Sequence, residues 1–277
     1  MLRSLSSAFT RSTFCDIIQY NDYSYLDCLI ERYNIKPRGD NSYFNHLKAI
    51  YSKMAKEYRC EYVYKNELIH ELIKKYGTKS TTFYNEFRVG ESIADIAFFN
   101  GESKAFEIKT QYDSSKRLNK QLQSYCKVFD KCYVVVPEER LFDYYEQNDN
   151  TGIILLKRVN GRMVLEEFRK AKQNDVYDAA LLMSCLRTNE YEKIIIDSFG
   201  SLPDASPGQM YKTCRDQICK LPADVLSNYF ITAVKTRRNN AQVIYKMPHA
   251  LRQICLALNL NSNNAKILLE KLNKPIN

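Results

Sequence analysis

The sequence contains 277 residues, of which 45% are hydrophobic and 26% charged, and its formal net charge is +9. These values are ordinary for a globular protein with one large domain or two small ones. No apolar run approaches the roughly 20 residues of a membrane span. The composition therefore excludes a helical membrane protein and predicts no membrane partner.

The positive charge is concentrated at the C-terminal end of the sequence. Residues 206–277 contain eleven Lys and Arg against three acidic residues, a net charge of +8, which leaves about +1 for the first 205 residues. A basic part beside a nearly neutral body favours a polyanionic partner, most simply nucleic acid. A charged surface that only keeps the protein in solution explains the same excess. The charge alone therefore does not distinguish nucleic-acid binding from solubility.

The cysteines and histidines do not have the spacing of a zinc site. The nine cysteines include no C-x-x-C pair, and only three histidines occur; both facts argue against zinc. Reduced thiols in the cytoplasm are the simplest explanation of these cysteines.

The first part of the chain is expected to be helical. Residues 1–59 form an N-terminal helical extension, interrupted at Lys36-Pro37-Arg38-Gly39-Asp40. The clearest helix of the sequence covers residues 60–76 and is stopped by Gly77. Within it, Glu61 is in step with Leu68 and Leu72, so Glu61 flanks the buried face.

Two short apolar runs after this helix carry charged residues. Following a strand at 81–89, the runs SIADIAFF and KAFEIKT contain Asp95, Glu107 and Lys109. The turn at Asn100-Gly101 predicts a β-hairpin, which makes the two strands antiparallel neighbours. Residues two apart in a strand share a face, so Glu107 and Lys109 project together and can meet Asp95.

This charged group on the hairpin has two interpretations. An exposed ion pair on a solvated face is the commoner meaning of a lone E-x-K. The alternative is a divalent-metal site of hard oxygen ligands with a lysine beside it.

The rest of the chain completes an α/β core and then turns helical. Ser114 starts a helix that continues through Phe129, and residues 132–137 form a strand buried on both faces. A short helix over 138–146 and strands at 152–156 and 163–168, joined by a turn at Asn160-Gly161, follow. The core domain is therefore expected over 60–170, and a basic helical domain over 171–277, with helices at 209–220, 223–236 and 249–258 and two helices around 259–264.

The order of these elements resembles the PD-(D/E)XK, or restriction-endonuclease-like, nuclease superfamily. That superfamily has an αβββαβ core with a mixed sheet, which is the order expected for residues 60–137. Asp95 on the second strand and Glu107-Ile108-Lys109 on the third match its motif, and Gln121 to Tyr125 is similar to the Q-x-x-x-Y element of RecB-like members. Three sequence segments look like those of a small bacterial subfamily: FRVGESIADIAFFNG, FEIKT and DSSKRLNKQLQSY. Ile93-Ala94-Asp95 lacks the proline of the family's name.

The resemblance implies roles for the matching residues. Asp95, Glu107 and the backbone carbonyl of Ile108 would bind Mg²⁺ or Mn²⁺, and Glu61 would contact the ion directly or through water. Lys109 would orient or help deprotonate the attacking water. Gln121 and Tyr125 complete the catalytic set. They would position the scissile phosphate or the glutamate.

Several further side chains are candidates for the site or for nucleic-acid binding. Glu86 is considered as an extra metal ligand, against the simpler interpretation of a surface acid. Beside the site, Lys116 and Arg117 are candidate phosphate contacts, although Arg117 could instead pair with Asp113. The candidate phosphate contacts in the basic C-terminal domain are Lys235, Arg237 and Arg238.

The resemblance therefore implies a Mg²⁺-dependent deoxyribonuclease in the cytoplasm, and we expect an endonuclease acting on double-stranded DNA. The residues themselves leave RNA as a substrate and exonuclease action open. The alternative is a catalytically inactive module with the nuclease fold that binds nucleic acid or a protein partner. The oligomeric state stays open, with a homodimer among the options.

Overall fold

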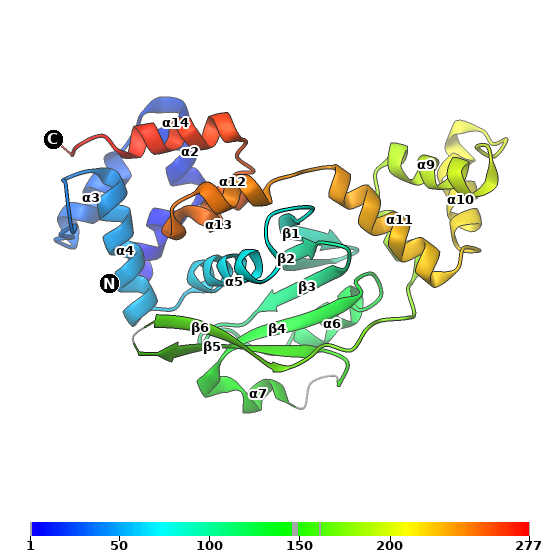
Figure 1. Ribbon diagram of the computed structural model, residues 1–277, viewed down its shortest axis with the longest axis horizontal. Coiled ribbons are helices and arrows are strands. Elements are labelled where there is room, and N and C mark those ends of the chain that lie inside the picture. The colour runs from blue at the N-terminus through cyan, green and yellow to red at the C-terminus, as the bar shows by residue number, and fades with distance from the viewer. Residues whose placement is uncertain (1, 146–148, 161, 277) are drawn as a thin grey trace.

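A six-stranded sheet with the strands in sequential order forms the centre of the molecule. The computed structural model describes residues 2–145, 149–160 and 162–276 (Figure 1). The strands are β1 (Thr82–Val89), β2 (Ser92–Phe99), β3 (Ser103–Ile108), β4 (Lys131–Pro137), β5 (Gly152–Val159) and β6 (Arg162–Arg169). Three pairings are antiparallel, β1–β2, β2–β3 and β5–β6, whereas β3–β4 and β4–β5 are parallel. The expected α/β class and mixed sheet are confirmed.

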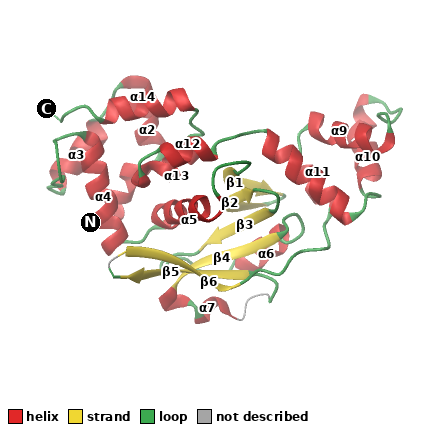
Figure 2. Ribbon diagram, viewed as in Figure 1, coloured by secondary structure: helices red, strands yellow, loops and turns green. Residues whose placement is uncertain are grey.

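Helices cover both faces of the sheet, as Figure 2 shows. Helix α5 (Glu61–Tyr76) packs on one face against Phe98 and Phe106, and α6 (Leu118–Tyr125) packs on the other against Ala97 and Ala105. Because both faces are buried, β4 has a near-continuous apolar sequence, and in β3 the polar residues are buried along with the apolar ones. The order α5, β1, β2, β3, α6, β4 is the order that the sequence predicted for 60–137.

Most of the remaining helices form two groups, one at each end of the molecule (Figure 1). The first group joins the two ends of the chain and packs on the α5 side. It comprises α1 (Leu2–Leu5), η1 (Ser6–Phe9), α2 (Arg11–Tyr20), α3 (Ser24–Arg32), α4 (Tyr43–Glu57), α12 (Ala241–Lys246), η3 (His249–Leu251), α13 (Arg252–Ala257) and α14 (Ser262–Leu272). A β-bridge between Ser42 and Pro275 ties the two ends together.

The second group packs on the α6 side of the sheet. It comprises α8 (Ala179–Ser184), α9 (Thr188–Phe199), α10 (Pro207–Ile218) and α11 (Ala223–Thr236). Phe230 of α11 is fully buried and contacts the rings of Phe87, Phe99 and Phe129. The basic C-terminal region is thus divided between the two groups: α11 packs on the core, and the chain then crosses to the N-terminal helices.

Some expected element bounds differ from the structure. The helix expected from Ser114 to Phe129 begins only at Leu118 and ends at Tyr125. Asp113 accepts hydrogen bonds from the backbone and hydroxyl of Thr110, and Arg140 binds the Asp113 carbonyl, so this segment is held as a loop.

The segments after β4 also differ in part from expectation. The helix expected over 138–146 is η2 (Glu138–Arg140) followed by α7 (Phe142–Tyr145), and residue 146 lies outside the described residues. Gly161 of the expected turn lies outside them as well. Over the described ranges, none of the helices has the length and apolar character needed to cross a membrane.

Candidate functional site

The hairpin of β2 and β3 places Asp95 opposite Glu107. The ladder pairs Ile96 with Phe106, so the next position along each strand brings Asp95 to face Glu107. The pairing of β2 with β3 ends there. The predicted meeting of the two acidic residues therefore occurs where the strands separate, at one end of the sheet.

Asp95 is held in place by a backbone group and a lysine. Its Oδ2 accepts a hydrogen bond of 2.7 Å from the backbone N–H of Ile108, and its Oδ1 lies 3.2 Å from Nζ of Lys65. Burial raises the pKa of Asp95 to about 7, and Glu107 and Glu61 add to the rise, whereas Lys65 and the Ile108 N–H oppose it. The carboxyl is therefore poised to change charge near neutral pH.

Glu107 is buried, with 3% of its surface exposed. Its Oε1 lies 2.7 Å from Nζ of Lys109, and its Oε2 lies 2.8 Å from the hydroxyl of Tyr125. A carboxylate this deeply buried requires such partners, because an unpaired one costs several kcal/mol. The predicted common face of Glu107 and Lys109 is confirmed by this contact.

Helix α6 supplies the other two predicted residues of the site. Oε1 of Gln121 accepts a hydrogen bond of 3.2 Å from Lys109. The Tyr125 hydroxyl lies 2.6 Å from the carbonyl oxygen of Ile93, as well as close to Glu107. Burial raises the pKa of Tyr125 and the neighbouring Glu107 raises it further, so Tyr125 stays protonated as a donor.

Lys65 of α5 belongs to the same group, and the sequence analysis did not identify it. Its Nζ lies 2.5 Å from Oε1 of Glu61 and also contacts Asp95, with only 5% of its side chain exposed. Burial alone lowers the pKa of Lys65, but Asp95 and Glu61 outweigh it and raise the pKa to about 12. Residues four apart share one face of a helix. The spacing between Glu61 and Lys65 was therefore the signal that could have found it.

The acidic groups provide the kind of oxygen donors that a divalent ion requires. Asp95, Glu107 and the Ile108 carbonyl are hard oxygen donors on neighbouring strand positions, and Mg²⁺ binds through few carboxylates while it keeps several waters. This donor chemistry fits Mg²⁺ or Mn²⁺. Glu61 is half-exposed and its carboxylate pairs with Lys65. Within the described ranges, no three His, Cys, Asp or Glu side chains gather closely enough to hold an ion by themselves.

The candidate nucleic-acid contacts lie in two places. Lys116 and Arg117 are exposed just before α6, next to the site. Lys235, Arg237 and Arg238 lie at the end of α11, and of these three Arg237 forms a close ion pair with Glu190. Glu86 is exposed on β1, at the residue that the β1–β2 register skips.

The fold and the site together define an α/β protein in which a carboxylate, lysine and amide cluster closes one end of a mixed sheet. The family model for Bacteriophage P4 protein cII matches residues 54–259, about three quarters of the chain, and the protein belongs to this family. Protein cII of Enterobacteria phage P4 is 25% identical over 174 residues, which cover 61% of this chain and 64% of that protein.

A solved structure also resembles part of the chain. The SPO1766 protein of unknown function from Silicibacter pomeroyi is 14% identical, with a TM-score of 0.34 over 50% of this chain and 90% of that one.

Proposed function

We propose that this protein is a divalent-metal-dependent nuclease with a PD-(D/E)XK core, which hydrolyses phosphodiester bonds in DNA. The observation that carries the proposal is the convergence of Asp95, Glu107 and Lys109 at one end of the sheet. Each of the three is positioned by a further contact, from Ile108, Tyr125 and Gln121 respectively. The arrangement supports a functional site because burying charged side chains costs folding free energy.

The proposed reaction is attack of water on a phosphate in line with the leaving oxygen. Asp95, Glu107 and the Ile108 carbonyl would hold the metal, which when bound would lower the pKa of the attacking water and offset charge on the phosphate. Lys109, steered by Glu107 and Gln121, orients the water and donates to the phosphate oxygen on which charge develops.

Residues of the two flanking helices complete the proposed site. Tyr125 fixes the orientation of the Glu107 carboxylate through its hydroxyl. Glu61, whose carboxylate on α5 is half-exposed, would contact the metal through water. The exposed Lys116 and Arg117 then serve as the nearest phosphate contacts to the reacting bond.

A second function is favoured by one specific observation. The Lys65 ammonium pairs with Asp95 and Glu61, and so supplies positive charge to the same carboxylates that a metal would use. An inactive module with the nuclease fold, which binds nucleic acid or a protein partner, would have a reason to keep such a lysine.

A plasmid-cleavage assay distinguishes the two functions. The nuclease proposal predicts nicking or linearisation with Mg²⁺ or Mn²⁺, abolished in Glu107→Ala and in Lys109→Ala. Glu91→Ala is the matched control, because Glu91 is an exposed acid at the turn before β2 and its partner, Lys120, is exposed as well. Cleavage that survives both site substitutions contradicts the proposal. DNA binding without cleavage in any metal supports the inactive module.

A further inference from the structure

A concave surface beside the edge strand β1 gathers four arginines from three separate segments of the chain. Its volume is about 480 Å³. It lies where β1 meets the end of α11, on the side of the second helical group (Figure 1). Its charged lining residues are Glu86, Arg88, Arg187, Arg237 and Arg238. We call it the arginine surface.

Arg237 holds this surface together and is itself buried. Its Nε and Nη2 lie 2.6 Å and 2.5 Å from the two carboxylate oxygens of Glu190, and Nη2 also donates to the carbonyl of Cys185 at 2.9 Å. The side chains of this pair are 9% and 10% exposed. A buried bidentate pair of this kind fixes geometry. Arg237 therefore ties the segment 185–190 to the end of α11.

The other three arginines are available to a ligand. Arg88 and Arg187 are exposed, and the guanidinium carbon of Arg238 lies 5.0 Å from the ring centre of Tyr84. Of the four arginines, Arg237 is the one in an ion pair with a described carboxylate. Among the described residues, the surface thus carries three guanidinium groups outside ion pairs and one further carboxylate, that of Glu86. Guanidinium groups bind phosphate oxygens with two parallel hydrogen bonds, which makes this surface suited to phosphate.

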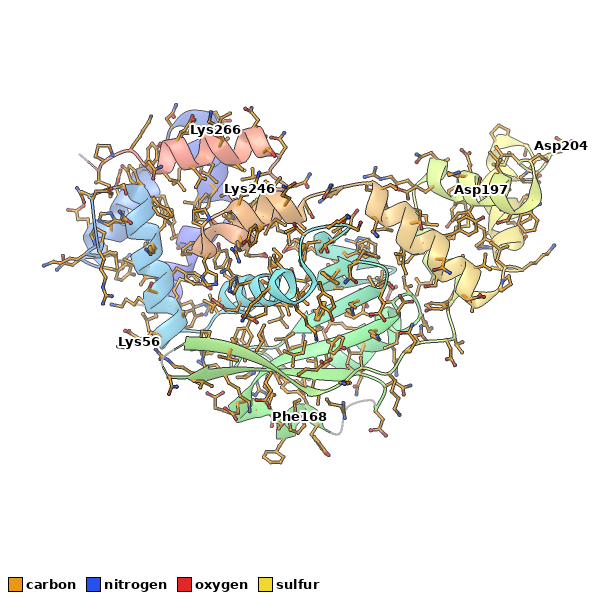
Figure 3. The ribbon with its side chains drawn as sticks, viewed as in Figure 1. Lys56, Phe168, Asp197, Asp204, Lys246 and Lys266 are labelled. Atoms are coloured by element: carbon orange, nitrogen blue, oxygen red, sulfur yellow. The ribbon has the colours of Figure 1, made fainter. Side chains whose placement is uncertain are left out.

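The arginine surface is one strand away from the candidate active site. Phe87 pairs with Ala94 and Asn85 with Ile96, so Glu86, which has a φ of 57°, lies opposite Asp95 in the register. Neighbouring strands are about 4.8 Å apart. In Figure 3, Asp197 marks α9 and Lys246 marks α12, and the segment that carries Arg237 and Arg238 runs between these helices.

We propose that the arginine surface binds the phosphodiester backbone of DNA next to the bond that is cut, through Arg88, Arg187 and Arg238. The inference rests on the proposed nuclease function and names a substrate-binding surface for it. Arg237, although adjacent in sequence to Arg238, acts as the buried clamp that positions the others. The surface contacts phosphates and contributes no preference for base sequence.

The salt dependence of DNA binding tests the proposal directly. Each phosphate contact contributes a slope of about −0.9 in a plot of log K against log salt concentration. Raising the salt from 50 to 200 mM weakens DNA binding. This weakening should be about 3- to 4-fold smaller for each of three variants than for the wild type: Arg88→Gln, Arg187→Gln and Arg238→Gln. Binding of a fluorescent 20-base-pair duplex, followed by anisotropy in EDTA so that no cleavage occurs, gives these slopes.

Arg11→Gln is the matched control, because Arg11 is exposed on α2 in the other helical group. It should leave the slope unchanged. Slopes of the three variants equal to that of the wild type, or no binding by the wild type, would overturn the proposal. Inorganic phosphate at matched ionic strength separates a free-anion site from a backbone site: displacement of DNA by millimolar phosphate would contradict the proposal.

The DNA-binding slopes and the cleavage assay test the arginine surface and the nuclease activity separately. Slopes that depend on the arginines in a protein that cleaves nothing would uphold the surface and reject the nuclease. Cleavage that requires Glu107, with slopes unaffected by the arginine variants, would do the reverse.

Discussion

Replacing Lys65 by methionine should tighten divalent-metal binding, because the lysine competes with the metal for Asp95. Methionine keeps most of the length of the side chain and removes its charge. The Lys65 ammonium lies 3.2 Å from Asp95. A unit charge pair at that separation is worth roughly 1 kcal/mol in bulk water and roughly 5 kcal/mol at an effective dielectric constant of 20.

This attraction is lost when a metal displaces the lysine, so the wild-type affinity is reduced by that amount. Since 1.4 kcal/mol corresponds to a factor of ten, Lys65→Met should lower the dissociation constant for Mn²⁺ by about tenfold or more. Titration calorimetry between pH 7 and 9 measures it. Asp95 has a pKa of about 7 in the wild type, and because Lys65 lowers this pKa, the variant is compared with the wild type at the upper end of the range. The rise in melting temperature with added Mn²⁺ is a second readout that needs no catalysis.

Lys74→Met is the matched control on the same helix, because Lys74 is 69% exposed and far from Asp95 in the helical repeat. It should leave the affinity unchanged. Metal binding by Lys65→Met that is equal to or weaker than that of the wild type would refute the argument, and would indicate that Lys65 supports the metal-bound state instead.

Three further outcomes follow from the packing and the ion pairs. Tyr125→Phe should lower the free energy of unfolding by about 1–2 kcal/mol, because a buried acceptor loses its donor. It should also slow cleavage, because the Glu107 carboxylate is no longer held in one orientation. Urea unfolding and a cleavage assay measure the two effects, and unchanged values for both would contradict the role given to the hydroxyl. Burial raises the pKa of Glu190, but hydrogen bonds, chiefly from Arg237, outweigh this and leave it lowered. The pair therefore stabilises the fold above the unfolded pKa of about 4.3, and this contribution is lost as the pH falls through the folded pKa. Glu190→Gln should make the urea midpoint decrease less steeply between pH 5 and 3. A decrease as steep as that of the wild type would contradict this role of the pair. Phe230→Ala should cost about 3–5 kcal/mol because it empties a fully buried aromatic site, and a loss below about 1 kcal/mol in urea unfolding would show that α11 is not anchored as described.

The central hairpin could be predicted because its signals are local. Alternation along the two runs, the turn at Asn100-Gly101 and the two-residue spacing of Glu107 and Lys109 depend only on neighbouring residues. The stop at Gly77 is local as well, and α5 does end at Tyr76. The start of α6 was misplaced because the loop before it is held by Arg140, a residue distant in sequence.

The contacts between distant segments could not be predicted in the same way. Lys65 projects toward Asp95 only because α5 packs across the hairpin, and the sequence shows merely that it lies four residues after Glu61. Arg237 and Arg238 look equivalent in sequence, yet one is buried against Glu190 and the other lies over Tyr84. The grouping of the first and last helices likewise depends on tertiary packing, since Ser42 and Pro275 are neighbours in space alone.

The most direct test of the proposed nuclease is the cleavage rate of Glu107→Gln. This substitution keeps the size of the side chain and a hydrogen-bonding group for Tyr125. It removes the charge that pairs with Lys109 and that we propose binds the metal. Single-turnover cleavage of plasmid DNA with saturating Mg²⁺ should fall by at least about 100-fold, the usual loss when one electrostatic partner of the transition state is removed. A rate within about threefold of the wild type, from a variant with unchanged urea unfolding, would contradict it.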